Sequence, residues 1–229
     1  MKNKIVFLVA SMSFSSIAYS SDIDVKRFLE SSKLPVNDKK EVFFEQMYEA
    51  IVKSNKEIIE EKNRIENTVV ISSYCDKYRI KECSKEKLLN KVNVIPPSLA
   101  LAQAANESAW GTSRFAQKAN NLFGEWCFNQ GCGIIPNSRP EGEKYEVQKF
   151  KSVKNSIMSY MHNLNSHPAY SSLRKIRNEV GVDGIEMAKG LESYSARGDE
   201  YIKELQSMIR YNNLEKYDEM FEKEVEEWM

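Results

Sequence analysis

Apolar residues recur at helical spacing in the first third of the chain. Between Asp38 and about Val69 they alternate with many glutamates and lysines, which gives one apolar face and one charged face. The members of this apolar stripe are Val42, Phe43, Met47, Ala50, Ile51, Ile58 and Ile65. The pattern predicts one long helix or a broken pair, followed by a helix, a loop and another helix that ends at Pro96 and Pro97.

A helix of a different kind is expected to begin near Ser98. Its first turn can contain a proline, because the N–H that proline lacks would be unpaired there in any case. Residues 99–108 are rich in alanine and apolar on nearly every side, so this helix is predicted to be buried. Glu107 lies in its last turn, directly before Trp110 and Gly111.

Glu107 is thus a carboxylate among apolar neighbours. Burial disfavours the charged form of a carboxyl group, so such a group keeps its proton to a higher pH and can act as a general acid near neutrality. The alternative is a structural carboxylate, satisfied in the core or at the helix end. The residues alone leave both interpretations open.

The segment from Gly124 to Phe150 breaks the helical pattern. It contains several glycines and prolines and ends in Tyr145–Phe150, a sequence that suits a short strand, so we expect a small β-lobe here. Helical signals resume where Ser152 can cap a helix presenting an apolar face.

Further helix starts are expected after this point in the chain. Pro168 can open one, Asp183 can cap another, and the last long helix follows Gly198. The acidic tail from Asp218 is expected to be solvated or frayed. The fold class predicted is mainly α (α+β).

Composition and charge restrict the class of protein. The chain has 229 residues, of which 41% are hydrophobic, enough for one globular core. Residues 1–20 contain Lys2 and Lys4, an apolar run and small residues at Ala18 and Ser20, the pattern of a secretory signal peptide. Without the two lysines, 31 basic residues face 33 acidic ones, a net charge of about −2. Nucleic acid is therefore not an expected partner.

Export makes disulfides the expected state of the four cysteines. Cys75 with Cys83, and Cys127 with Cys132, are each close enough in sequence to close a small loop, and we favour these two local bridges among the three pairings that four cysteines allow. A four-cysteine zinc site is the alternative, but structural zinc ligands are usually two to four residues apart. With two histidines and no HExxH motif, neither a catalytic metal nor a cofactor is expected.

Three sequence motifs resemble one known family. Residues 104–111 (AANESAWG), 120–124 (NNLFG) and 165–170 (NSHPAY) resemble the glucosaminidases of glycoside hydrolase family 73, and most closely their Bax-type members. The resemblance implies a lysozyme-like fold, with a helical lobe facing a small β-hairpin lobe across a saccharide groove, and makes Glu107 the catalytic acid. We therefore expect an N-terminal helical region at 21–92, a glucosaminidase domain at 93–216 and an acidic tail at 217–229.

The resemblance implies hydrolysis of the β-1,4 bond after N-acetylglucosamine in peptidoglycan. Glycoside hydrolysis usually needs a second carboxylate. The candidates in the β-lobe are Glu125, Glu141, Glu143 and Glu146, of which Glu141 is favoured because it lies at the expected turn, whereas the last two are expected to be solvated.

Alternatively, the 2-acetamido group of the substrate attacks its own anomeric carbon. The resemblance implies that Tyr170 lines the site, where its hydroxyl could orient that group. The aromatic residues Trp110, Phe123 and Trp126 are candidates to contact the sugar, and Phe128 could stack on it as well.

Two other functions stay open at this point. A lytic transglycosylase also uses one glutamate on a lysozyme-like scaffold, and a non-hydrolytic wall-binding or assembly protein would hold glycan without cleaving it. The expected partner in each case is the glycan strand of peptidoglycan.

No lipobox cysteine follows the signal, so no membrane anchor is expected after its removal. Two disulfides favour an exported, periplasmic protein.

Overall fold

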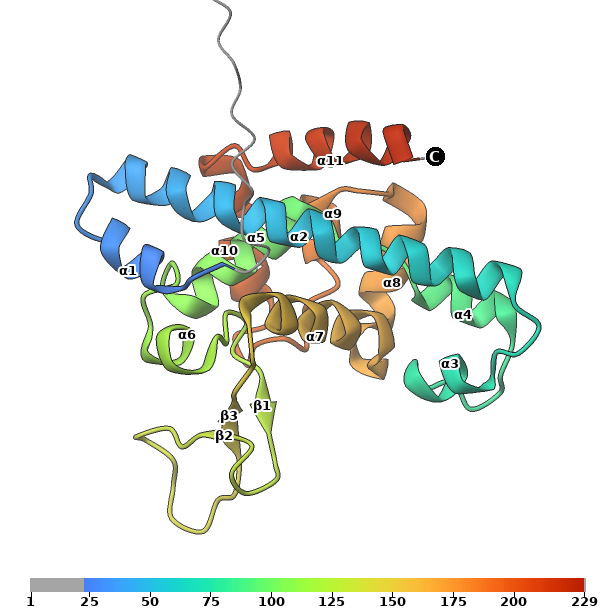
Figure 1. The fold of residues 1–229 in the computed structure, drawn as a ribbon, viewed down its shortest axis with the longest axis horizontal. Coiled ribbons are helices and arrows are strands. Elements are labelled where there is room, and N and C mark those ends of the chain that lie inside the picture. Colours follow the sequence, from blue (N-terminus) through green and yellow to red (C-terminus); the bar gives the residue numbers. More distant parts are fainter. Residues whose placement is uncertain (1–22, 229) are drawn as a thin grey trace, which may run out of the picture.

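The computed structural model describes residues 23–228, which form a helical body and one small sheet (Figure 1). The predicted signal peptide at 1–20 lies outside the described residues. The helices of the N-terminal half are α1 (Lys26–Ser31), α2 (Val36–Asn67), α3 (Ser72–Lys77), α4 (Lys85–Lys91), α5 (Pro97–Ser108) and α6 (Arg114–Ala119). After the sheet come α7 (Val153–Ser166), the 3-10 helix η1 (Pro168–Tyr170), α8 (Ser171–Val180), α9 (Gly184–Ala188), α10 (Asp199–Tyr211) and α11 (Glu215–Trp228). This architecture confirms the mainly α, lysozyme-like prediction.

Helix α2 is a single helix of 32 residues, not a broken pair. Its apolar stripe is buried, as the spacing predicts, and packs against α5 and α7. Helix α1 covers the beginning of α2, where the rings of Phe28 and Phe43 lie 4.9 Å apart.

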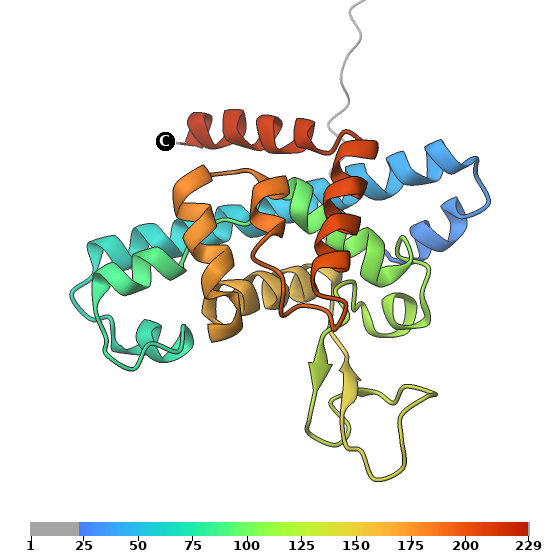
Figure 2. The same ribbon diagram turned by 180° about the vertical axis from the view of Figure 1, so that it is seen from behind.

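Helix α5 is the centre of the body. It contacts α2, α9, α10 and α11, and every residue from Pro97 to Ala105 is buried. Figures 1 and 2 show α2 on one face of α5 and the α8–α10 segment on the opposite face. Pro97 occupies the first turn, as expected. The small alanine side chains let these helices approach closely, and α5 delivers Glu107 at its carboxyl end.

The β-lobe projects from one side of the helical body (Figures 1 and 2). Its antiparallel sheet has the order β1-β3-β2, with β1 at Trp126–Cys127, β2 at Gly133–Ile134 and β3 at Glu146–Gln148. Val147 of β3 pairs with Trp126 on one side and with Ile134 on the other. The strand expected at Tyr145–Phe150 is therefore present, although it is shorter than the segment.

Helix starts predicted from capping residues are confirmed. Ser152 accepts a hydrogen bond from the backbone N–H of Asn155 at the start of α7. Asp183 accepts one from Glu186 at the start of α9, and Pro168 opens η1.

The acidic tail is folded, which corrects the expectation that it is solvated or frayed. Residues from Glu215 onward form α11, and Tyr217, Asp218 and Phe221 are buried. The sequence signal was misleading because the charged residues occupy only one face of this helix. The apolar face packs on α5, and Tyr217 lies 4.9 Å from Tyr48 of α2 between ring centroids.

Both local disulfides are confirmed. Cys75 bonds Cys83 and Cys127 bonds Cys132, so no free cysteine is left for zinc in the part of the chain that the structure describes. Within residues 23–228, every helix is too short or too polar to cross a lipid bilayer.

Candidate active site

A cleft of about 600 Å³ opens where the helical body meets the β-lobe. Glu107 comes from the end of α5, Glu125 from the segment before β1, and Ser159 and His162 from α7. Tyr170 of η1 lines the same cleft. Segments far apart in sequence therefore bring two carboxylates, a histidine and a tyrosine to one surface.

A chain of buried hydrogen bonds holds Glu107. The Tyr201 hydroxyl donates to Glu107 Oε1 at 2.8 Å, and Gln103 Nε2 donates to the Tyr201 oxygen at 3.1 Å. The Tyr160 hydroxyl in turn donates to Gln103 Oε1 at 2.7 Å. Burial raises the pKa of Glu107, while the bond from Tyr201 and the charge of Arg197 partly oppose this rise. The carboxyl group is thus oriented and holds its proton more strongly than an exposed glutamate.

A left-handed turn ends α5 directly after Glu107. Ala109, Trp110 and Gly111 all have positive φ, at 49°, 60° and 74°. Only glycine fits the last position, because an added Cβ on Gly111 would lie 2.3 Å from the ring of Phe28. The turn ends α5 and leaves Glu107 at the cleft.

Asn121 fixes the segment on the other side of Glu107. Its Oδ1 accepts hydrogen bonds from the N–H groups of Phe123 and Glu125, and its Nδ2 donates to the carbonyls of Glu125 and Gln148. The resulting turn places Gly124 against the Glu107 carboxylate: a Cβ added to Gly124 would lie 3.5 Å from Glu107 Oε2.

Glu125 is the second carboxyl group of the cleft. The Ser159 hydroxyl of α7 donates to its Oε2 at 2.7 Å, whereas its Oε1 is buried and has no hydrogen-bond partner within residues 23–228. Burial raises the pKa of Glu125 to about 7, although the bond from Ser159 opposes the rise. An unpartnered buried carboxyl oxygen facing a cleft is a functional-site signal, because such an atom costs stability without a ligand.

Tyrosine rings form a wall of the cleft. Tyr194 stacks on Tyr201 with ring centroids 5.6 Å apart, and Tyr170 lies 6.1 Å from Tyr194. The Tyr194 hydroxyl donates to the carbonyl of Phe123 at 2.8 Å, which ties this wall to the Asn121 turn.

Comparison with known proteins identifies one family. The profile of the Glucosaminidase family, described as mannosyl-glycoprotein endo-beta-N-acetylglucosaminidase, matches residues 84–214, more than half of the chain. The chain belongs to the Glucosaminidase family. It is also 40% identical over 130 residues to Protein bax of Escherichia coli (strain K12), a match that covers 55% of this chain and 46% of that protein. The chain thus matches about half the length of this curated relative. No solved structure matches it.

Membership of this family indicates a domain of the glycoside hydrolase type. The aromatic residues predicted to contact sugar differ in their position relative to the cleft. Trp126, half exposed, and Phe128, 75% exposed, both line the cleft. Phe123 forms its floor but is fully buried and stacked on Tyr160. Trp110 does not line the cleft, because the left-handed turn directs it toward Phe43 and Phe44 of α2.

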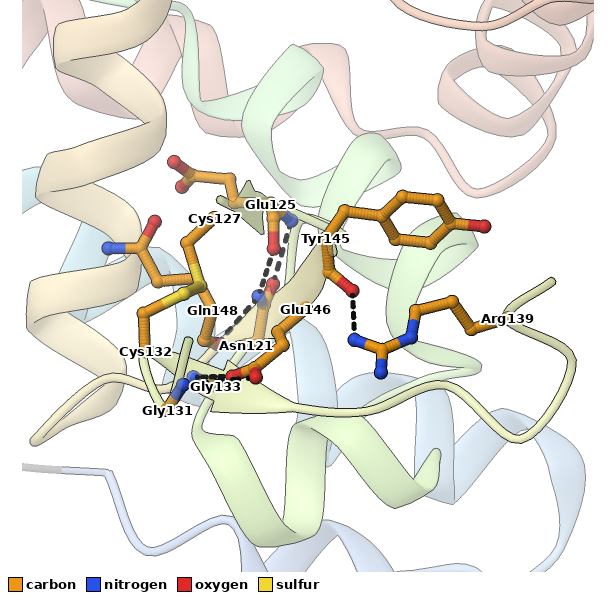
Figure 3. The surroundings of a disulfide bond; sticks show 10 residues. All are labelled: Asn121, Glu125, Cys127, Gly131, Cys132, Gly133, Arg139, Tyr145, Glu146 and Gln148. Carbon is orange, nitrogen blue, oxygen red and sulfur yellow. Dashed lines mark hydrogen bonds between the residues drawn. A yellow bond between two sulfur atoms is a disulfide. The ribbon is translucent and has the colours of Figure 1, made fainter. Parts of the chain in front are cut away.

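The other predicted carboxylates of the glucosaminidase domain lie away from the cleft. Glu141 and Glu143 are exposed in the loop between β2 and β3, and neither lines the cleft. Glu146 is not solvated as expected: it is 4% exposed and accepts hydrogen bonds from the N–H groups of Gly131 and Gly133 (Figure 3). These bonds lower its pKa, so Glu146 is an ionised structural group that fixes the turn bridged by Cys127 and Cys132.

Metal-ligating chemistry has little support in the described residues. The one cluster with suitable spacing combines Cys127, Cys132 and Glu146, but its two sulfur atoms form a disulfide.

His167 caps η1 by accepting a hydrogen bond from the N–H of Ala169. His162 lines the cleft with its Nδ1 buried and unpartnered, and its pKa is lowered by burial and then by the nearby charges of Lys77 and Arg79.

Sequence reasoning named Glu125 among the β-lobe candidates but favoured Glu141, and it missed the group that holds Glu107. Glu125 follows the Asn121–Gly124 turn, and this adjacency to a motif was the available signal for it. Gln103 is a polar residue in an apolar helix, one turn before Glu107, and this isolation pointed to a specific partner. The partner itself, Tyr201, is 98 residues away in sequence and had no such signal.

Proposed function

We propose that this protein is an endo-β-N-acetylglucosaminidase that cleaves the β-1,4 bond after N-acetylglucosamine in peptidoglycan, with Glu107 as the general acid. The observation that carries the proposal is the placement of Glu107: it lies in a cleft, is held by Tyr201 and has a raised pKa. A protonated carboxyl group in this position can donate to the glycosidic oxygen as the bond breaks. Family membership supports the reaction class.

Glu125 is the second carboxyl group in this proposal, in place of Glu141. It shares the cleft with Glu107, and its Oε1 is buried without a hydrogen-bond partner among the described residues. In this proposal, a water molecule or the acetamido group of the sugar becomes that partner. Tyr170, in the cleft wall, remains the candidate to orient that acetamido group. Trp126 and Phe128 offer aromatic faces at the edge of the cleft for stacking on sugar rings.

The test of Glu107 is product analysis with a matched variant. Purified protein and its Glu107→Gln form are incubated with peptidoglycan, and the reducing ends of the soluble fragments are reduced with borohydride and identified by mass spectrometry. Reduced N-acetylglucosamine ends that disappear in the variant support the proposal. Anhydromuramoyl ends would make the protein a lytic transglycosylase, and retained binding to sacculi without fragments would make it a wall-binding protein.

The choice between the second carboxylates is tested by two further variants. Glu125→Gln is expected to lower turnover by roughly 100-fold or more, the usual scale for loss of an acid–base group. Glu141→Gln serves as the control, since its exposed side chain lies outside the cleft. Equal losses in both variants, or a loss confined to Glu141→Gln, would contradict the assignment.

We also propose that the protein is exported and acts in the periplasm. The two disulfides support this location, because such bonds persist in oxidising compartments. Fractionation of cells that produce the full chain, with mass measurement of the amino terminus, tests both the location and removal of the signal.

A further inference from the structure

A second cavity of about 600 Å³ lies next to the catalytic cleft, between the α3–α4 loop and α8. Its lining contains six basic and only two acidic side chains, a net charge of +4 in a chain whose formal net charge is zero. The basic residues are Arg79, Lys81, Lys87, Lys91, Arg174 and Lys175. We refer to this cavity as the basic annex.

The cations of the basic annex are mostly without acidic partners. Among residues 23–228, Lys87 is the one lining cation that forms a salt bridge, with Glu82. Lys91 is held by the carbonyls of Tyr78 and Ser166, and its pKa is lowered first by burial and then by the charges of Arg174 and Arg79. Positive charge is therefore concentrated here, and an anionic ligand would relieve the repulsion.

Arg174 shows that the basic annex is built into the fold. Arg174 is only 5% exposed, and its Nη1 donates to the carbonyls of Leu164 and His167 at 2.8 and 2.9 Å. Within the described chain no hydrogen bond engages its Nε or Nη2, although Arg174 lines the cavity. The guanidinium group is thus anchored on one side, which leaves its other donors for a planar anion such as a carboxylate.

The basic annex is connected to the catalytic cleft. Arg79 lines both cavities, and the chain passes from Tyr170 in the cleft directly to Ser171 in the basic annex. The residues 79–82 that form one wall lie inside the loop closed by the Cys75–Cys83 disulfide. This bridge holds the wall in place against α8.

We propose that the basic annex binds the carboxylates of the peptide stem attached to the glycan strand. The proposal rests on the proposed function, since it names the part of the peptidoglycan substrate that this region recognises. Glycan held in the cleft carries acidic peptides on its muramic residues, and the adjoining cavity is lined by six basic and two acidic side chains. Recognition would favour strands that still bear their stems.

The first test compares two substrates. The ratio of kcat/KM on stem-bearing glycan to that on glycan stripped of its stems by an amidase is measured for the wild type and for Lys81→Ala/Lys175→Ala. We expect this ratio to fall roughly five-fold in the variant, through KM, and to fall with rising salt in the wild type. Lys203→Ala/Lys223→Ala removes the same charge from exposed positions on α10 and α11 and is expected to keep the ratio. An unchanged ratio in the first variant would overturn the proposal.

A binding measurement separates this proposal from the proposed function. The free tetrapeptide stem, the same peptide with amidated carboxylates, and inorganic phosphate are titrated into Glu107→Gln protein and followed by NMR. Shifts of residues 79–82 with the free peptide, lost on amidation, support the basic annex even if wild-type protein cleaves no peptidoglycan. Equal response to the amidated peptide, no response, or a stronger response to phosphate would overturn it, whether or not cleavage occurs.

Discussion

Gly124 lies beside the Glu107 carboxylate, at a position where an added methyl group would be in ordinary van der Waals contact with it. It has a φ of +68°, and an added Cβ would lie 3.5 Å from Glu107 Oε2. We expect Gly124→Ala to lower peptidoglycan turnover by roughly ten-fold or more, because the methyl group occupies space that the substrate needs beside the acid, with only about 1–2 kcal/mol of backbone strain. Turnover and thermal unfolding measured together separate the two effects.

Gly142→Ala is the matched control. Gly142 also has a positive φ, at +88°, but its Cβ would meet nothing within 4 Å. It is expected to show the same backbone strain with near-normal turnover. Comparable losses of activity in both variants would show that backbone strain, and not the space filled beside Glu107, is the cause.

Tyr201 moderates the effect of burial on the pKa of Glu107. Its hydrogen bond favours the ionised carboxylate and lowers the pKa that burial raises. Tyr201→Phe removes this bond, so the pKa of Glu107 is expected to rise. Since a general acid must be protonated, the alkaline limb of the pH–rate profile should move to higher pH. Tyr194→Phe is the comparison, because the Tyr194 hydroxyl donates to the Phe123 carbonyl and not to Glu107. If the alkaline limb moves in Tyr194→Phe and not in Tyr201→Phe, the role of Tyr201 is contradicted.

Helix α11 supports the helix that carries Glu107. Asp218 accepts hydrogen bonds from the N–H and hydroxyl of Ser98 in the first turn of α5, and from the N–H of Gly184 in α9. One carboxyl group therefore joins three helices at the end of α5 opposite the cleft.

Removal of this carboxyl group tests the connection. Asp218→Ala leaves buried donors without an acceptor and is expected to lower the free energy of unfolding by about 2 to 4 kcal/mol, measured by urea denaturation. Glu219→Ala, one residue later and exposed, is expected to cost less than about 0.5 kcal/mol. If both variants unfold at the same urea concentration, α11 contributes no such support.

Stability of the whole molecule is expected to depend on pH through Glu125. Its pKa is about 7 in the folded protein against 4.5 for an ordinary glutamate. The folded protein therefore keeps a proton that the unfolded chain releases. The resulting contribution to stability is complete below about pH 4.5 and is lost as the pH rises through 7.

Glu125→Gln isolates this contribution. The difference in unfolding free energy, wild type minus variant, is expected to fall by roughly 2 to 3 kcal/mol between pH 4 and pH 8. Asp218, whose pKa is also raised to about 7 by burial, acts in the same direction but is common to both proteins. A difference that does not change with pH would mean that Glu125 titrates as an exposed glutamate does.

Local patterns along the chain determined much of this protein. Some features depend on interactions within a few residues or on one amphipathic face. These are the α2 stripe, the apolar α5 with Glu107 in its last turn, the caps at Ser152 and Asp183, and the two short disulfide loops. Such interactions have a fixed spacing in sequence, so the sequence alone predicts them. The tail was the exception, because charge on one face of α11 concealed the buried face on the other.

Tertiary structure alone decided what surrounds Glu107. Contacts between segments that no spacing rule connects create the relay through Gln103 and Tyr201. They also bring Glu125 into the cleft, leave Glu141 outside it and turn Trp110 away from it. The basic annex likewise combines the α3–α4 loop with α8. The physical reason is that burial and charge at a point in space sum over all neighbouring segments, and these neighbours are defined only when the chain is folded.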